Sequence, residues 1–390
     1  MTTKRQKKYV SKRSKTKRND HKRLGGGLSI STKNVIHSLF VQIRSFQQEH
    51  DVNHVYHIVP LIHGDNGMAL LETSIRAQVS KFSYTTFTSH LTFHSGRSCH
   101  LTMSVTDGTI DDLQHVVYKI HLWMSILDMF ASPESSRELT VYLIMSPLLK
   151  TLPSRNDQEI DTIHANTAYT FCCKAKNDMV IFRKEEWFKV FIHETMHAFC
   201  LDFACDNQDA VHKRVISLFR GIDPNIQDIR LYESYTEMWA ETVHLVLCTS
   251  LKYPQLSFRN IFPKILKGIH DEQSWSAKQC VKVLAHCGFT YQQLVEGTQE
   301  FKYKETMTSV FSYYVLKCVW MLHINDFIAW CVRTSNDSTF RCLQFTKTSE
   351  TMIQFCDLLE DLYKDKVMSR LEIHDNGTNR DQRSLRMSCT

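Results

Sequence analysis

The sequence contains no C-x-x-C motif, although it has 13 cysteines among its 390 residues. This argues against a four-cysteine zinc site of the usual spacing. The chain also opens with basic and polar residues rather than an apolar segment, so we expect no secretory signal peptide. Scattered thiols without such a signal predict reduced cysteines and an intracellular protein, in the cytoplasm or the nucleus.

The sequence also lacks an uninterrupted apolar run that could span a membrane. The most apolar stretch, residues 310–332, is broken by Lys317, His323, Asn325 and Asp326. We therefore expect a buried core helix there and no membrane span. Hydrophobic residues make up 43% of the chain, which suits one large globular domain or two. The sequence gives no indication of the oligomeric state.

The first 27 residues differ in composition from the rest. They hold 11 Lys and Arg against one Asp, a net charge of +10, and end in Gly25–Gly27. Such a block repels itself, so we expect residues 1–30 to be a disordered tail. It predicts binding to nucleic acid or another polyanion, or a nuclear-import address. The tail also resembles those of giant DNA virus proteins, which would imply a host cell or virion as its location.

The strongest chemical signal is an H-E-x-x-H motif at His193, Glu194 and His197. Residues four apart share a helix face, so both imidazoles could bind one metal ion, with the Glu194 carboxylate beside it as general base. Composition alone predicts about 0.05 accidental matches per chain. The surrounding segment, residues 185–203, is apolar on most sides, which predicts a buried helix. Buried His and Glu need partners, either one Zn²⁺ or hydrogen bonds within a core.

A catalytic zinc site needs a third protein ligand. The metzincin continuation requires Gly and His after the second motif histidine, and the "AFCLDF" that follows His197 has neither. A second helix, expected over residues 230–247, carries Glu233, Glu237 and Glu241 as one stripe. Taken alone, such an acidic stripe is usually a solvated helix face.

"HETMH" followed by "TEMWAE" resembles the gluzincin metallopeptidases, over roughly residues 165–247. The resemblance implies that Glu237 is the third zinc ligand. It implies that Glu241 is an outer-shell carboxylate that orients one of the two histidines. Glu233 is the alternative third ligand, because Glu233 and Glu237 also fit an E-x-x-x-E pattern. Thr236 stands where many gluzincins have Asn.

The resemblance implies an α+β, zincin-like fold. A mixed sheet, with an edge strand that precedes the H-E-x-x-H helix and binds substrate backbone, is followed by a mainly helical C-terminal half. The expected strands are a hairpin over 89–105, a strand over 138–145 and a hairpin over 166–173 and 178–183, and further helices are expected over 35–46 and 112–130. The expected divisions are a basic tail (1–30), a mixed half (31–204), a helical half (205–368) and a polar tail (369–390) that frays.

The resulting hypothesis is a zinc-dependent peptidase that acts on a peptide or protein substrate with Glu194 as general base. The family also implies a Tyr or His that stabilises the oxyanion, and the candidates are Tyr235, His244, Tyr313 and Tyr314. One alternative is a catalytically inactive zincin-fold binding or virion protein that holds nucleic acid with its basic tail. Another is a metal-free helical scaffold with an exposed acidic stripe.

Overall fold

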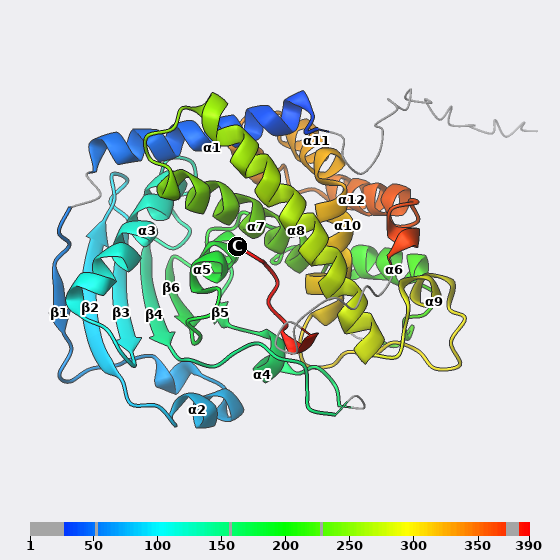
Figure 1. The fold of residues 1–390 in the computed structure, drawn as a ribbon, viewed down its shortest axis with the longest axis horizontal. Coiled ribbons are helices and arrows are strands. Elements are labelled where there is room, and N and C mark those ends of the chain that lie inside the picture. Colours follow the sequence, from blue (N-terminus) through cyan, green and yellow to red (C-terminus); the bar gives the residue numbers. More distant parts are fainter. Residues whose placement is uncertain (1–26, 51–53, 156–157, 227–228, 372–381) are drawn as a thin grey trace, which may run out of the picture.

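A computed structural model describes residues 27–50, 54–155, 158–226, 229–371 and 382–390. The predicted basic tail therefore lies outside the described residues, apart from its last few positions. In the described part, a mixed sheet forms one side of the molecule and a helical region forms the other (Figure 1).

The sheet has six strands. In spatial order they are β1 (Ile58–Pro60), β2 (Thr85–Thr92), β3 (Ser98–Val105), β4 (Glu138–Met145), β6 (Lys176–Ile181) and β5 (Ala168–Thr170). β3, β4 and β6 run parallel, while the other pairs are antiparallel. The predicted mixed sheet and both predicted hairpins are confirmed, and β5 is the edge strand that precedes the H-E-x-x-H helix.

The helices cover most of the remaining chain. They are α1 (Ile30–Glu49), α2 (Thr73–Val79), α3 (Ile110–Asp128), α4 (Thr162–Ala165), α5 (Trp187–Ala198), α6 (Asp209–Leu218), α7 (Leu231–Lys252), α8 (Phe258–His286), α9 (Tyr291–Glu296), α10 (Lys317–Leu322), α11 (Ile324–Ser335) and α12 (Ser349–Leu362), with 3-10 helices η1 (Met68–Leu70), η3 (Phe340–Leu343) and η4 (Met368–Arg370) and a π-helix η2 (Phe311–Leu316). After α5 the described chain adds no strand to the sheet, so the mainly helical C-terminal half is confirmed.

Strand β4 is apolar along most of its length because both of its faces are covered. Leu139, Val141 and Leu143 pack in the core that includes α3 and α5. Tyr142 and Ile144 point to the other face and pack against α2. The sheet is therefore a buried platform on which α5 is held.

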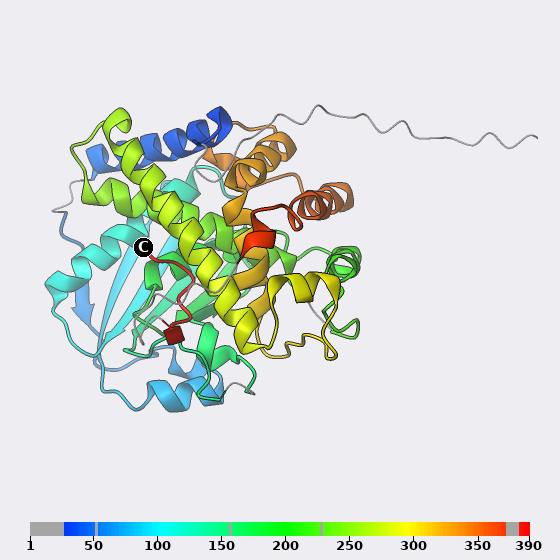
Figure 2. The same cartoon turned by 45° about the vertical axis from the view of Figure 1, so that its right-hand side comes forward.

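Helix α1 ties the two halves of the molecule together. It precedes the sheet in sequence, yet it packs against α7 and α11 of the helical half (Figures 1 and 2). The Ser29 backbone N–H and the Thr32 hydroxyl both donate to Asn325 at 2.9 Å. The predicted mixed half, residues 31–204, thus places its first helix on the helical half.

The apolar run at residues 310–332 does not form one helix. It divides into η2, α10 and α11, with a 90° bend at His323. Most of its side chains are buried, including Trp320 and Trp330, as expected for core helices. Among the described residues no single helix is long and apolar enough to cross a membrane, although the bent pair reaches that length and composition together.

The polar tail predicted to fray over residues 369–390 is ordered at residues 382–390, where the prediction is wrong, while residues 372–381 lie outside the described residues. Residues 382–390 run into the middle of the molecule, beside α5 and α8 (Figures 1 and 2). Leu385, Met387 and Ser388 are all buried. The apolar side chains at alternate positions in this otherwise polar stretch explain why it packs in extended form.

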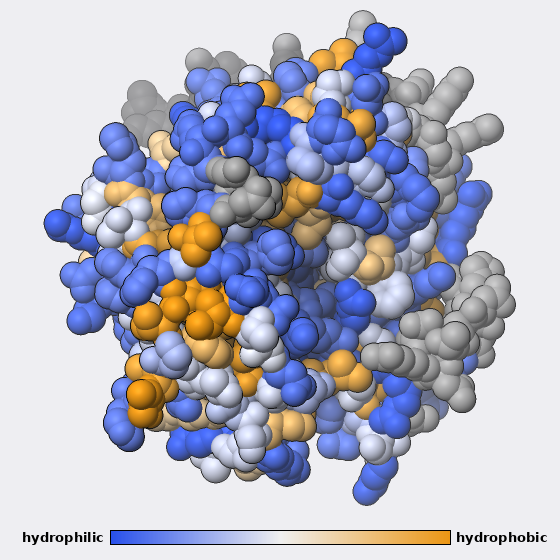
Figure 3. Space-filling model, turned by 60° about the vertical axis from the view of Figure 1, so that its left-hand side comes forward, coloured by the Kyte–Doolittle hydropathy of each residue, from blue (hydrophilic) through white to orange (hydrophobic). Residues whose placement is uncertain are grey.

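The outer surface is mostly hydrophilic on the face drawn in Figure 3, with apolar side chains gathered mainly in one area. The exposed large apolar residues of the described chain include Val55, Ile62 and Phe171. Such residues are normal on a folded protein, and we attach no function to them.

Candidate metal centre

Helix α5 places the H-E-x-x-H motif in the interior of the molecule. Every residue from Phe188 to Ala198 is buried, as the sequence predicted. The helix lies between the edge strand β5 and helix α7. Both histidines of the motif therefore face α7 with little access to bulk solvent.

Three donor atoms from α5 and α7 converge on one point. The Nε2 atoms of His193 and His197 lie 3.1 Å apart. The Oε2 atom of Glu233 lies 3.1 Å from the first and 3.3 Å from the second. Zinc bound tetrahedrally, about 2.0–2.1 Å from each ligand, separates its ligand atoms by about 3.3 Å. These buried residues lie close enough together to hold a metal ion.

The other nitrogen of each imidazole is hydrogen-bonded to a buried carboxylate. Nδ1 of His193 lies 2.8 Å from Oε2 of Glu237, and Nδ1 of His197 lies 2.5 Å from Oδ2 of Asp202. An ionised carboxylate only accepts hydrogen bonds, so each Nδ1 carries a hydrogen, and a ring in its neutral form has its lone pair on Nε2. Lone pairs from both rings and from Glu233 then meet, which is unfavourable unless a proton or a metal cation lies between them.

The structure does not place Glu237 where the preferred sequence assignment put it. Glu237 binds the outer nitrogen of His193 and the ammonium group of Lys189, whereas the alternative ligand Glu233 joins the two Nε2 atoms. The two glutamates lie one helical turn apart, about 6 Å along α7. Sequence spacing could not determine which turn lies level with the histidines.

Glu241 does not take the predicted outer-shell position. Its carboxylate pairs with Lys317 at 2.7 Å, and it hydrogen-bonds neither histidine in the described structure. Glu237 and Asp202 orient the histidines instead. The sequence analysis missed Asp202, which follows His197 by five residues in "HAFCLDF" and also accepts a hydrogen bond from Thr236 at 3.1 Å.

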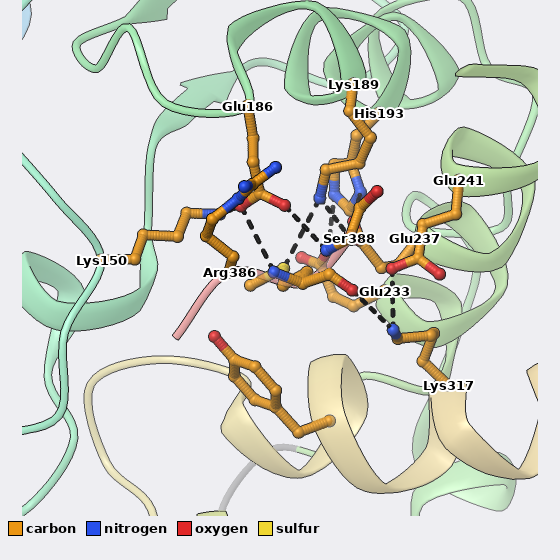
Figure 4. A network of polar contacts seen from close by, with 12 residues as sticks. Lys150, Glu186, Lys189, His193, Glu233, Glu237, Glu241, Lys317, Arg386 and Ser388 are labelled. Carbon is orange, nitrogen blue, oxygen red and sulfur yellow. Dashed lines mark hydrogen bonds and ion pairs between the residues drawn. The ribbon is translucent and has the colours of Figure 1, made fainter. Parts of the chain in front are cut away.

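The acidic stripe of α7 is buried rather than solvated. Glu237 pairs with Lys189 and Glu241 with Lys317 (Figure 4). Glu233 has no Lys or Arg partner within the described chain, and its carboxylate pairs with the two histidines. A buried carboxylate without a cation costs several kcal/mol, so Glu233 is the member of the stripe that most requires a positive charge from elsewhere.

The site attracts positive charge, as the pKa directions show. Burial lowers the pKa of His193, but hydrogen bonds to Glu233 and Glu237 outweigh it and leave that pKa raised. His197 behaves in the same way, with Asp202 and Glu233 as the carboxylates, and its pKa is raised further. The same pocket that favours an imidazolium would favour a metal cation.

Glu194 lies beside the cluster without belonging to it. It lines a small cavity of about 30 Å³, together with His193, Ala168 and Tyr313. No hydrogen bond to its carboxylate is found within the described residues. Burial raises the pKa of Glu194, so its carboxylate is a better proton acceptor than an exposed one.

Of the predicted oxyanion candidates, Tyr313 is the one near the cluster. Its ring centroid lies 6.0 Å from that of His193, and it lines the same cavity. Tyr235 and Tyr314 each donate to a backbone carbonyl at 2.6 Å. His244 lies against Cys248 and does not line this cavity.

A disulfide fixes the end of the motif helix. Cys173, in the turn between β5 and β6, is bonded to Cys200, just after α5. The backbone N–H groups of both residues donate to the carbonyl of His197, at 3.3 and 3.1 Å. The expectation that the cysteines are reduced is therefore wrong for this pair, which is distant in sequence and adjacent in the fold.

No protein-family model, curated protein or solved structure matches this chain. The case for a function therefore comes from the chemistry of the cluster.

Proposed function

We propose that the protein is a zinc-dependent peptidase of gluzincin type that binds one zinc ion. The observation that carries the proposal is the convergence of lone pairs from His193, His197 and Glu233, with the Glu194 carboxylate beside them. Two imidazoles and a carboxylate are a ligand set of catalytic zinc, which leaves a further position for water. A merely structural zinc site would have no need of an adjacent base.

Each residue near the cluster has a role in this proposal. His193, His197 and Glu233 hold the ion, while Glu237 and Asp202 keep both imidazoles in the tautomer that offers Nε2. When bound, zinc lowers the pKa of a coordinated water and polarises the scissile carbonyl.

The proton transfers fall to Glu194. Its carboxylate accepts the proton of the attacking water and then donates it to the nitrogen of the leaving amine. A pKa raised by burial suits both steps, because the group must first take up and then release the proton near its working pH. The hydroxyl of Tyr313 is the candidate donor to the oxyanion that develops on the carbonyl oxygen.

The edge strand β5 is the candidate binding site for substrate backbone. It pairs antiparallel with β6 on one side, and in the described sheet no strand pairs with its other side. Ala168, its first residue, lines the cavity beside His193 and Glu194. A peptide that added to this edge as a further strand would pass directly by the cluster.

The test combines metal analysis with peptide cleavage by full-length protein. Wild type should contain about one zinc per chain, and Glu194→Gln should keep it, because Glu194 is not a ligand. Cleavage of a peptide library should fall about 10²–10⁴-fold in Glu194→Gln. The exposed Glu49 provides the matched control, Glu49→Gln, which should cleave normally.

Three outcomes would overturn the proposal. Cleavage by Glu194→Gln at the wild-type rate would exclude its role as the base. One zinc per chain with no cleavage by wild type would favour the alternative, an inactive zinc-binding protein that uses its basic N-terminal tail to hold nucleic acid. A wild type that neither contains nor takes up zinc would leave only a helical scaffold.

A further inference from the structure

The last residues of the chain, 384–390, lie in extended form inside the protein, and we call them the C-terminal segment. Ser384 forms an antiparallel bridge with Thr151. The backbone N–H of Leu385 donates to the carbonyl of Lys150 at 2.9 Å. This is main-chain pairing of the kind by which proteins bind extended peptides.

Buried charged side chains bind the backbone of the C-terminal segment near the metal centre (Figure 4). Glu186 accepts hydrogen bonds from the N–H groups of Ser388, at 2.8 Å, and Met387, at 3.3 Å. Lys317 donates to the carbonyl of Met387 at 3.0 Å. These groups recognise main-chain atoms, so they would serve another extended peptide equally well.

A second acidic side chain fixes the end of the C-terminal segment. Glu272, on α8, accepts hydrogen bonds from the Ser388 hydroxyl and from the N–H groups of Cys389 and Thr390, at 2.7, 3.1 and 3.0 Å. Glu272 is buried and bonds only to this segment within the described chain. It holds the segment without touching the metal cluster.

Met387 is the residue of the C-terminal segment that reaches the metal centre. Its sulfur lies 3.7 Å from Nζ of Lys189, and its side chain lines the cavity beside His193, Glu194 and Ala168. That cavity, about 30 Å³, has room for one or two waters but not for an amino-acid side chain. Met387 therefore fills space that a substrate residue next to the metal would need.

We propose that the C-terminal segment is an internal plug that fills the space beside the metal centre where a substrate residue would lie. It is held there in the manner of a bound peptide and keeps the metal centre closed until it leaves. This inference rests on the proposed peptidase function and adds its regulation. It also indicates the preferred ligand, an extended peptide with a long unbranched apolar side chain beside the metal.

Two substitutions release the plug without altering the metal ligands. Glu272→Ala removes the acceptor for the last three residues, and Met387→Ala opens the cavity. Met368→Ala, a fully buried methionine of η4, is the matched control for lost packing. The readouts are the rate at which 1,10-phenanthroline removes zinc from the folded protein and kcat/KM for a fluorogenic peptide.

Both rates should rise about ten-fold in the two release variants, as expected if the open state is populated at about 10% in wild type and fully in the variants. The control should keep both rates. The synthetic peptide Ser-Leu-Arg-Met-Ser-Cys-Thr should then compete with substrate in Glu272→Ala. Folded release variants with wild-type rates of zinc removal would overturn the proposal and leave a structural clasp only.

The two proposals fail in distinguishable ways. Faster zinc removal without cleavage by any variant would support the plug and refute the peptidase. If wild type cleaves peptides and neither release variant changes the rate, the peptidase proposal is supported and the plug is refuted. If the variants do not fold, hydrogen exchange on wild type decides: a substrate-like peptide should speed exchange of the Leu385–Thr390 amides, and exchange that stays as slow as in β4 would refute the plug.

Discussion

Substituting Glu233 and Glu237 in turn tests the arrangement of the metal centre most directly. The two glutamates lie one turn apart on α7, and both are buried. Glu233→Gln changes an atom of the donor triangle, whereas Glu237→Gln leaves the triangle intact and changes the acceptor for Nδ1 of His193 and the partner of Lys189. We expect zinc binding to be lost in the first and weakened in the second.

The expected sizes follow from linkage between binding and folding. With free zinc at 100 times the wild-type Kd, zinc adds about 2.7 kcal/mol to the free energy of unfolding. Loss of an outer partner of a metal-bound histidine typically weakens binding 10–100-fold. At the same free zinc, Glu237→Gln should therefore keep an increment of about 0.4–1.4 kcal/mol. Glu233→Gln should show an increment near zero.

The assay is urea unfolding of each protein with and without zinc, followed by tryptophan fluorescence. The difference between the two conditions matters because Glu237→Gln also leaves Lys189 without its partner. Breaking a buried ion pair costs about 3–5 kcal/mol, and this loss is the same with and without metal. The difference in the free energy of unfolding with and without zinc is therefore not affected by the broken ion pair.

The opposite ranking would refute the arrangement. If Glu237→Gln abolished the zinc increment while Glu233→Gln kept it in full, Glu237 would be the ligand, as the gluzincin resemblance first implied. Equal, full increments in both variants would show that zinc binds elsewhere in the chain.

Three further predictions concern other parts of the chain. Burial raises the pKa of Glu305 from 4.5 to about 7, so the folded protein holds this proton more tightly than the unfolded chain does. The free energy of unfolding should therefore fall by about 3 kcal/mol as pH rises from 4.5 to 7. Urea unfolding at pH 5 and pH 8 should show that Glu305→Gln lacks this fall. Opening the disulfide between Cys173 and Cys200, 27 residues apart, should lower the free energy of unfolding by about 3.5 kcal/mol. Urea unfolding of Cys173→Ser measures this loss against the free-thiol control Cys205→Ser, and an equal loss in both variants would refute the prediction. Deleting residues 1–27 should abolish salt-sensitive binding to duplex DNA in fluorescence anisotropy while leaving zinc content unchanged; unaltered DNA binding would exclude the tail as the polyanion site.

The local elements were predictable because their signals are local. Strand β4 matches the predicted residues 138–145, since its β-branched and apolar run fits a strand covered on both faces. The hairpin predicted over residues 89–105 is formed by β2 and β3, although β2 begins earlier, at Thr85. Such features depend on neighbours a few residues away, which the sequence displays directly.

Features that depend on distant partners were not predictable in the same way. The C-terminal segment is polar enough to suggest a frayed end, but its backbone N–H groups donate to Glu186 and Glu272, which lie more than a hundred residues away in sequence. The bend at His323 is likewise not signalled in the sequence, because no proline lies there. Both are consequences of the packed interior rather than of local preference.

The metal centre depends both on a local motif, which the sequence displays, and on a distant partner, which it does not. One signal in the sequence could still have indicated which glutamate faces the two histidines. Lys189, His193 and His197 repeat every four residues on α5, as Glu233 and Glu237 do on α7. In the structure the two stripes face each other while their helices run in opposite directions, so Lys189 pairs with Glu237 and His197 with Glu233. A lysine one turn before the motif neutralises one carboxylate permanently, so that carboxylate is a poor candidate for the metal. The glutamate left without a lysine is the one whose charge the metal must balance, and charge matching of this kind identifies Glu233 where sequence spacing cannot.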